Sequence, residues 1–257
     1  MNDIVEIEIL QFFLIYLLLI IVLVIMKISK IKQSKLLIIA SVRMTVQLIL
    51  IGYILMYIFE NPHPIFPILY FIIMTVFAIT RVLIKNKGIN RKFKLAIASG
   101  ITFSGTSIML FFIYVIVGEN IFNAQYVIPI GGMIMGNTMT GVSLGVKAFR
   151  ESFDGKKNQI NALLNVGAEP NKILLPFVNR AVETALLPVL NSMLGMGIVA
   201  LPGLMTGQIL SGTAPTTAIL YQVSIMIAIC TVVCLSTFIS LYFGYKSLYN
   251  SKKQIEL

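Results

Sequence analysis

The sequence has few charged residues. Of its 257 residues only 12% are charged, whereas a soluble domain carries roughly a quarter. Hydrophobic residues make up 58% of the chain, and the mean hydropathy is +0.92. Because a chain of this composition is too apolar for a soluble domain, the sequence predicts a multi-pass protein of the cell (cytoplasmic) membrane.

The chain also lacks the motifs of several enzyme classes. It has no Gly-x4-Gly-Lys-Ser/Thr phosphate loop, so it does not hydrolyse ATP by that route. It has no HExxH zinc motif, and its one histidine, His63, stands between two prolines in a predicted turn. Cys230 and Cys234 lie one helical turn apart, too close along one helix face for a disulfide of normal geometry. We therefore expect no catalytic residue, no metal site and no cofactor bound by this chain.

Acidic residues are scarce as well. The sequence has ten, and none falls in the middle of a predicted span. Ion-coupled carriers commonly use buried carboxylates for coupling. Their absence argues against a proton-driven carrier and favours energy supplied by a partner subunit.

Seven apolar runs are long enough to cross the bilayer. A helix rises about 1.5 Å per residue, so about 20 residues span a hydrocarbon core about 30 Å thick. The runs are 9–26, 36–59, 65–84, 95–117, 126–146, 186–210 and 217–243. The predicted fold class is therefore an all-α integral membrane protein with seven transmembrane helices, forming one polytopic domain over residues 1–257.

Basic residues fall in alternate loops. The first, third and fifth loops contain all the loop lysines and arginines, and the second, fourth and sixth contain none. Because basic loops favour the cytoplasm, we expect the N-terminus outside, beside Asp3 and Glu6, and the C-terminus inside, with Lys252 and Lys253. The net charge of +10 is then explained by the basic cytoplasmic loops. These loops would also be weakly attracted to anionic membrane lipid. No nucleic-acid partner is expected.

The fifth loop, residues 147–185, has room for structure of its own. Ile160, Leu163, Leu164 and Ala168 repeat at the spacing of one helix face, and a break is expected from Gly167 onward. A second amphipathic helix, over about 173–185, should lie along the membrane surface and lead into the sixth span. From periodicity alone, an ordinary amphipathic connector on the bilayer fits equally well.

Small residues four positions apart predict close helix packing in the fifth and sixth spans. Such spacing lets helices approach closely in lipid, where packing is a main source of association. The pairs are Gly132 with Gly136, Gly141 with Gly145, and Gly203 with Gly207.

Polar residues inside the spans are candidates for a substrate path. Arg43 and Gln47 lie one turn apart in the second span, where a charge is costly unless it snorkels or is paired. Prolines and glycines interrupt the sixth span, and interrupted membrane helices often mark binding sites. The predicted path is lined by Arg43, Gln47, Asn137, Asn191, Thr206 and Gln208. Methionines gather around the same two spans, where core packing and contact with a soft metal are both open.

Three segments resemble the FetB (YbbM) family of ABC transporter permeases, which is similar also to plant aluminium-resistance permeases. They are IPIGGMIMGNTM at 128–139, ALLNVGAEPNKI at 162–173 and ALPGLMTGQILSGTAPTTAILYQ at 200–222. Arg43 and Gln47, four apart, add to the match, which runs in the same order over nearly the whole chain.

The resemblance implies a function and a set of partners. The family consists of seven-span permeases that form a homodimer and work with a separate FetA-type ABC ATPase, which binds the ATP and Mg. The family's proposed role is iron export. Segment 162–173 is similar to the coupling helices of such permeases, which dock into a groove on the ATPase. The residues expected to make this contact are Ala162, Leu163, Leu164, Val166, Gly167, Ala168 and Pro170.

The chain departs from the family pattern just before the Leu-Pro-Gly segment. The family commonly has an Asp there and a Lys three residues later, where this chain has Asn191 and Leu194. This difference weakens a direct transfer of iron specificity. Two alternatives stay open at the level of sequence: a secondary carrier driven by an ion gradient, and a membrane scaffold that transports nothing.

Overall fold

The computed structural model describes residues 8–248. Regular structure in this range is helical, apart from one bridge between Met196 and Ala200. Within it, seven helices are long and apolar enough to cross a membrane: Ile9–Ile28, Ser34–Glu60, Ile65–Lys85, Arg91–Val117, Ala124–Gly155, Pro170–Gly195 and Pro215–Tyr245. The prediction of an all-α, seven-span membrane protein is confirmed. The predicted orientation stays a prediction, and its residues Asp3, Glu6, Lys252 and Lys253 lie outside the described residues.

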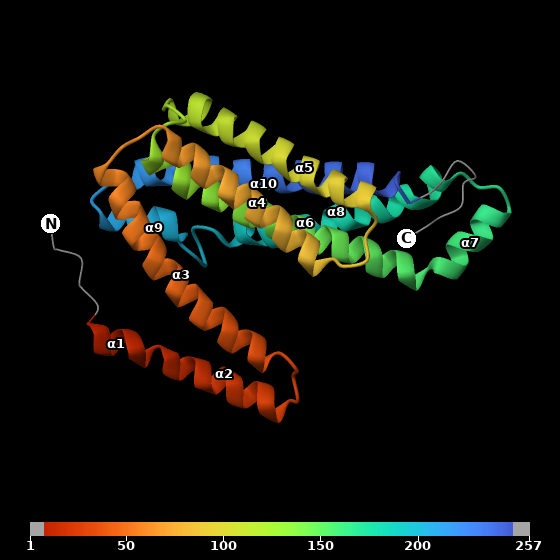
Figure 1. Ribbon diagram of the computed structural model, residues 1–257, viewed down its shortest axis with the longest axis horizontal. Helices are drawn as coiled ribbons and strands as arrows, with labels where there is room; N and C mark the ends of the chain where they lie inside the picture. The colour runs from red at the N-terminus through yellow and green to blue at the C-terminus, as the bar shows by residue number, and fades with distance from the viewer. Residues whose placement is uncertain (1–7, 249–257) are drawn as a thin grey trace. The chain divides into compact units, whose positions relative to one another are not determined.

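The helices form two compact units. The first contains the chain up to Pro62 together with Leu210–Gly212, and the second contains His63–Ile209 and the chain from Thr213 onward. In the first unit, α1 (Ile9–Leu14) and α2 (Tyr16–Ile28) are followed by α3 (Ser34–Glu60), and a short turn joins α2 to α3 (Figure 1). The Tyr16 hydroxyl hydrogen-bonds that of Thr45. No residue of α1 or α2 is buried, which suits helices whose solvent is lipid.

Helix α10 (Pro215–Tyr245) is central to the second unit. It packs against α5 (Arg91–Phe111), α6 (Ala124–Gly155) and α8 (Pro170–Gly195), and α4 (Ile65–Lys85) packs against α6 (Figure 1). The π-helix η1 (Phe112–Val117) continues α5, and two short helices, α7 (Lys157–Asn165) and α9 (Gly203–Leu210), precede and follow α8. Large side chains from four of these helices are fully buried in one cluster: Ile97, Phe149, Leu174 and Leu241.

Glycines bring α5 and α10 close together. A methyl group on Gly100 would lie 2.6 Å from Ser240 Oγ, and one on Gly244 would lie 2.7 Å from the Phe93 ring. Asn90 links the start of α5 to the residues that follow α10. Its Oδ1 accepts a hydrogen bond from the Phe93 backbone N–H at 2.7 Å and caps α5, while its Nδ2 donates to the Ser247 carbonyl at 2.9 Å.

The sixth span differs from the predicted range 186–210. It is the 26-residue helix α8, Pro170–Gly195, which continues through Pro176 and Pro188. The segment 173–185, expected as a separate surface helix, is part of α8, and its apolar stripe packs into the protein core. The helix stops at Gly195, an irregular stretch follows, and α9 begins at Gly203.

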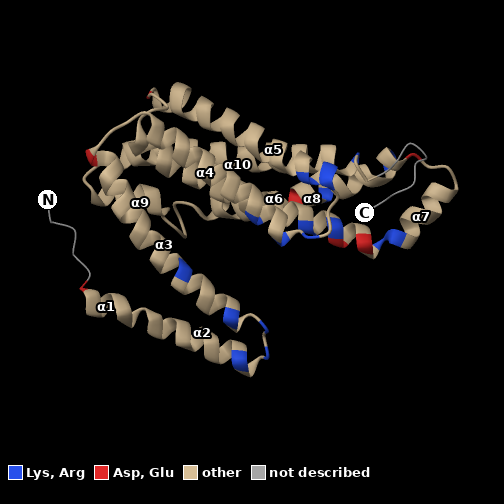
Figure 2. Ribbon diagram, in the orientation of Figure 1, with Lys and Arg blue, Asp and Glu red and all other residues tan. Residues whose placement is uncertain are grey.

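Basic residues of the second unit gather at one end of its helices. Figure 2 shows them where α4 ends, where α5 begins and along the last turns of α6. Among them are Lys85, Arg91, Lys94, Lys147 and Arg150. One end of a helical membrane protein that is rich in Lys and Arg is the arrangement that the positive-inside rule requires. We call it the basic end.

Candidate functional site

The segment between α6 and α8 is ordered as a short helix and a tight turn at the basic end. Helix α7 ends in a Schellman motif, in which the Ala168 N–H donates to the Leu163 carbonyl and the Gly167 N–H donates to the Leu164 carbonyl, both at 3.0 Å. Gly167 has φ = +84°, a left-handed conformation that favours glycine. Two residues later, Glu169 precedes Pro170 at the first turn of α8. The Val-Gly-Ala-Glu-Pro sequence thus stops one helix and starts the next.

Helix α7 has an inner face that anchors it. Ile160 is 1% exposed and belongs to the same buried cluster as Leu174 and Val178 of α8. Leu164 and Ala168 are half-buried and pack against that cluster. The apolar face expected from the sequence is therefore used largely within the protein. Pro170 is buried as well.

The outer face of α7 and its turn are exposed. Val166 is 81% exposed and Leu163 is 40% exposed. Ala162 and Gly167 are exposed beside them, and a methyl group added to Gly167 would meet nothing within 4 Å. We call Ala162, Leu163, Val166 and Gly167 the α7 tip. An apolar tip held by a packed inner face has the form of a helix that docks into a partner's groove.

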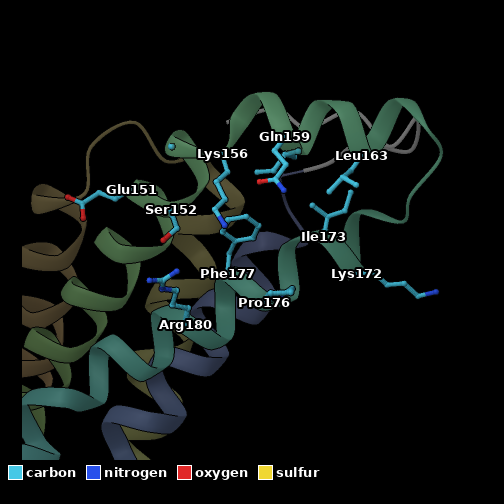
Figure 3. A pocket seen from close by; sticks show the side chains of 12 residues that line it. Glu151, Ser152, Lys156, Gln159, Leu163, Lys172, Ile173, Pro176, Phe177 and Arg180 are labelled. Atoms are coloured by element: carbon cyan, nitrogen blue, oxygen red, sulfur yellow. The ribbon is translucent and has the colours of Figure 1, made fainter.

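An open groove of about 750 Å³ lies between the end of α6, α7 and the start of α8. Apolar side chains line it, including Ile160, Ile173 and Phe177, and Lys156 and Arg180 lie along it. Figure 3 shows the Lys156 side chain extending toward the Phe177 ring, with the ammonium 5.8 Å from the ring centroid. Lys172 also lines the groove, and its ammonium lies 3.4 Å from the Glu169 carboxylate.

The glycines singled out in the sequence have different surroundings. A methyl group on Gly141 or Gly145 would lie 2.5 Å from Val233 Cγ1 or Thr237 Cγ2 of α10 respectively. One on Gly132 would lie 3.5 Å from Met74 Cε of α4. Three others have open space around them: Gly136, Gly203 and Gly207. Of these six glycines, Gly141 and Gly145 are the two at which another helix approaches most closely.

The residues of the predicted substrate path lie on four helices. Arg43 and Gln47 are exposed on α3 in the first unit. In the second unit, Asn191 is exposed near the end of α8, while Thr206 and Gln208 are partly buried on α9. Asn137 is partly buried on α6, where its Nδ2 donates to the Met133 carbonyl of its own helix at 2.8 Å. Of these helices, α8 and α9 flank the irregular stretch 196–202 in the sequence.

Sequence analysis did not select Gln222 of α10. This residue is 5% exposed, and its Nε2 donates to Met196 Sδ at 3.8 Å, at the point where α8 gives way to the irregular stretch. Its Oε1 is buried and has no hydrogen-bond partner among the described residues. Leaving such an acceptor unpaired costs about 1–3 kcal/mol. A lone glutamine within the apolar run 217–243 was the available signal.

No group of three or more His, Cys, Asp or Glu side chains gathers within residues 8–248. Cys230 and Cys234 are free thiols, partly buried on α10.

Comparison with known proteins gives a consistent result. A family described as "Uncharacterised protein family (UPF0014)" matches residues 9–249. The UPF0014 membrane protein YjkA of Bacillus subtilis is 32% identical over 224 residues, which cover 87% of this chain and 88% of that protein. The protein named "Probable iron export permease protein FetB" of Escherichia coli is 30% identical, over 83% of this chain and 81% of its own length. The "Protein ALUMINUM SENSITIVE 3" of Arabidopsis thaliana is 31% identical, over 83% and 77%. No solved structure matches the chain.

Proposed function

This chain belongs to the UPF0014 family of membrane proteins, and we propose that it is the permease subunit of an ABC transporter. In this proposal a separate FetA-type ATPase binds ATP and Mg and supplies the energy. The chain itself has no phosphate loop, so energy from nucleotide hydrolysis has to come from a partner.

The observation that carries the proposal is the α7 tip. An exposed apolar tip at the end of a seven-span membrane protein has no role in holding this chain together, since Val166 is 81% exposed and the anchoring is done by Ile160. A groove on a soluble partner would remove the tip from water. The tip lies beyond α6, whose last turns carry Lys147 and Arg150, so the positive-inside rule favours the cytoplasm for it, where an ATPase would be.

A metal ion is the proposed cargo, and export is the proposed direction. The support is the printed name of the Escherichia coli relative, a probable iron export permease. Asn191 and Leu194 are the positions where the chain departs from the family's usual Asp and Lys, and both are exposed at the end of α8. The buried Oε1 of Gln222 and the irregular stretch 196–202 provide neutral oxygen acceptors along the proposed path.

Two copies of the permease are proposed to act together, as in the resembled family. The open space around Gly136, Gly203 and Gly207 leaves these glycines available for a close helix contact with a second copy. The transport motion would then be a rocking of α6 and α8, because both lead directly into α7 and its turn.

Purification tests the partnership. The permease extracted from its native membrane in mild detergent should carry a subunit with a phosphate loop, and the pair should hydrolyse MgATP. The permease expressed alone is the control and should hydrolyse none. Transport that continues in cells lacking the ATPase and follows an ion gradient would show instead a secondary carrier.

A further inference from the structure

We propose that the groove between α6, α7 and α8 binds the phosphate headgroup of an anionic phospholipid, with the lipid's acyl chains lying against the membrane-spanning part of α8. Of the α7 tip only Leu163 also lines this groove, and Ala162, Val166 and Gly167 do not. The proposal therefore rests on the groove's own depth, charge and lining, and it does not depend on an ATPase partner.

The depth of the groove fits the lipid headgroups. Helix α6 begins at Ala124, so Gly145 lies about 31 Å further along its axis, which is close to the hydrocarbon thickness of about 30 Å. A methyl group on Gly145 would lie 3.4 Å from the Ala181 carbonyl, which places the neighbouring Arg180 at the same level. From Arg180 the groove runs outward past Phe177 to Lys156. Its inner end is thus at the hydrocarbon boundary, and its outer end is in the headgroup layer.

The charge of the groove fits a phosphate. Lys156 and Arg180 both lie along it and are exposed. Glu151 is the one acidic residue in its lining, and its carboxylate is already 3.6 Å from the Lys147 ammonium on the side of α6. The groove therefore presents an excess of positive charge, and basic pockets between helices at this side of a membrane bind anionic headgroups.

The lining distinguishes a lipid from a free phosphate. Ile160, Ile173, Leu163 and Phe177 give the groove an apolar lining, and the Lys156 ammonium lies over the Phe177 ring. A hydrated phosphate gains no binding free energy from an apolar lining. The glycerol backbone and the first carbons of two acyl chains would cover that apolar surface and remove it from water, which is favourable. A volume of about 750 Å³ is large enough for a headgroup with these attached carbons.

The test compares lipids on the full-length permease in detergent. Titration with phosphatidylglycerol, followed by native mass spectrometry, should show one preferential site per chain, and phosphatidylcholine should bind it at least tenfold more weakly. The double substitution Lys156→Gln with Arg180→Gln should weaken phosphatidylglycerol binding by roughly 25-fold, since each surface cation contributes about a factor of five. The charge-retaining pair Lys156→Arg with Arg180→Lys should keep it within about threefold.

A matched control removes the same charge elsewhere on the basic end. Lys92→Gln with Lys94→Gln changes two exposed lysines of α5 that do not line the groove, and binding should be unchanged. An equal loss in this control would overturn the proposal, because it would show only a diffuse charge attraction. Displacement of the lipid by equimolar soluble glycerophosphate would also overturn it, since the site would then take a free phosphate. Equal binding of phosphatidylcholine would contradict the role of the cations.

Discussion

Val166→Asp should strongly weaken the binding of the ATPase subunit while leaving the permease folded. The side chain is 81% exposed, so the substitution removes no internal packing. In the docked complex, however, it would bury an unpaired carboxylate in an apolar contact. We expect a loss of about 2–4 kcal/mol of binding free energy, which is roughly 30- to 700-fold in affinity. Affinity measured between the two purified subunits checks this.

A control for Val166→Asp is Lys87→Gln. It changes the net charge by the same amount at an exposed position in the turn between α4 and α5, away from the α7 tip. It should leave the affinity for the ATPase unchanged. If Val166→Asp binds as well as the wild type, the α7 tip is not the docking element and the assignment is wrong.

Gly141→Leu should destabilise the permease strongly. Even a single methyl group at this position would lie 2.5 Å from Val233 Cγ1, and the leucine side chain would force α6 away from α10. Overpacking of this kind costs about 1–3 kcal/mol and often more. Thermal unfolding in detergent should show a lowered midpoint for Gly141→Leu, and the same direction is expected for Gly145→Leu, which meets Thr237.

Gly136 provides the comparison on the same helix. It has the same four-residue spacing from another glycine, but nothing lies within 4 Å of a methyl group placed on it. In the detergent-solubilised monomer, Gly136→Leu should therefore unfold at the wild-type temperature. Equal destabilisation by Gly136→Leu and Gly141→Leu would contradict the packing that distinguishes them.

The seven spans were predictable because their signal is physical and local. A run of about 20 apolar residues has few structures available in lipid except a helix that satisfies its own backbone. The first five spans and the last agree with the structure to within a few residues, except for the extension of α6 to Gly155. That extension is polar, and helix propensity without an apolar pattern gives a weak signal.

The predicted bounds of the sixth span, 186–210, lie too far toward the C-terminus, because an apolar stripe on a helix has two possible physical causes. A helix that lies on a bilayer and a helix that packs on a protein both show an apolar stripe with a period near 3.6 residues. Ile173, Leu174 and Val178 form such a stripe, and in the structure they are buried against other helices. The prolines do not interrupt this helix, since α8 continues through Pro176 and Pro188 and ends at Gly195.

The position of the candidate site along the chain could be predicted from the sequence, but which of its side chains are buried and which are exposed could not. The Gly167 turn and the helix before it lie where they were expected, because Gly and Pro determine local backbone geometry. Which of Leu163 and Leu164 is exposed depends on α8, which packs against the inner side of α7. The spacing of residues within one helix does not show which other helix it contacts. For the same reason, the sequence did not show that Gln222 lies next to Met196.

The most direct test of the whole account is transport in vesicles that contain purified permease and ATPase. Ferrous iron should move across the membrane only when both subunits and MgATP are present, and Val166→Asp in the permease should stop it. Transport by the permease alone, driven by an ion gradient and indifferent to ATP, would contradict the account.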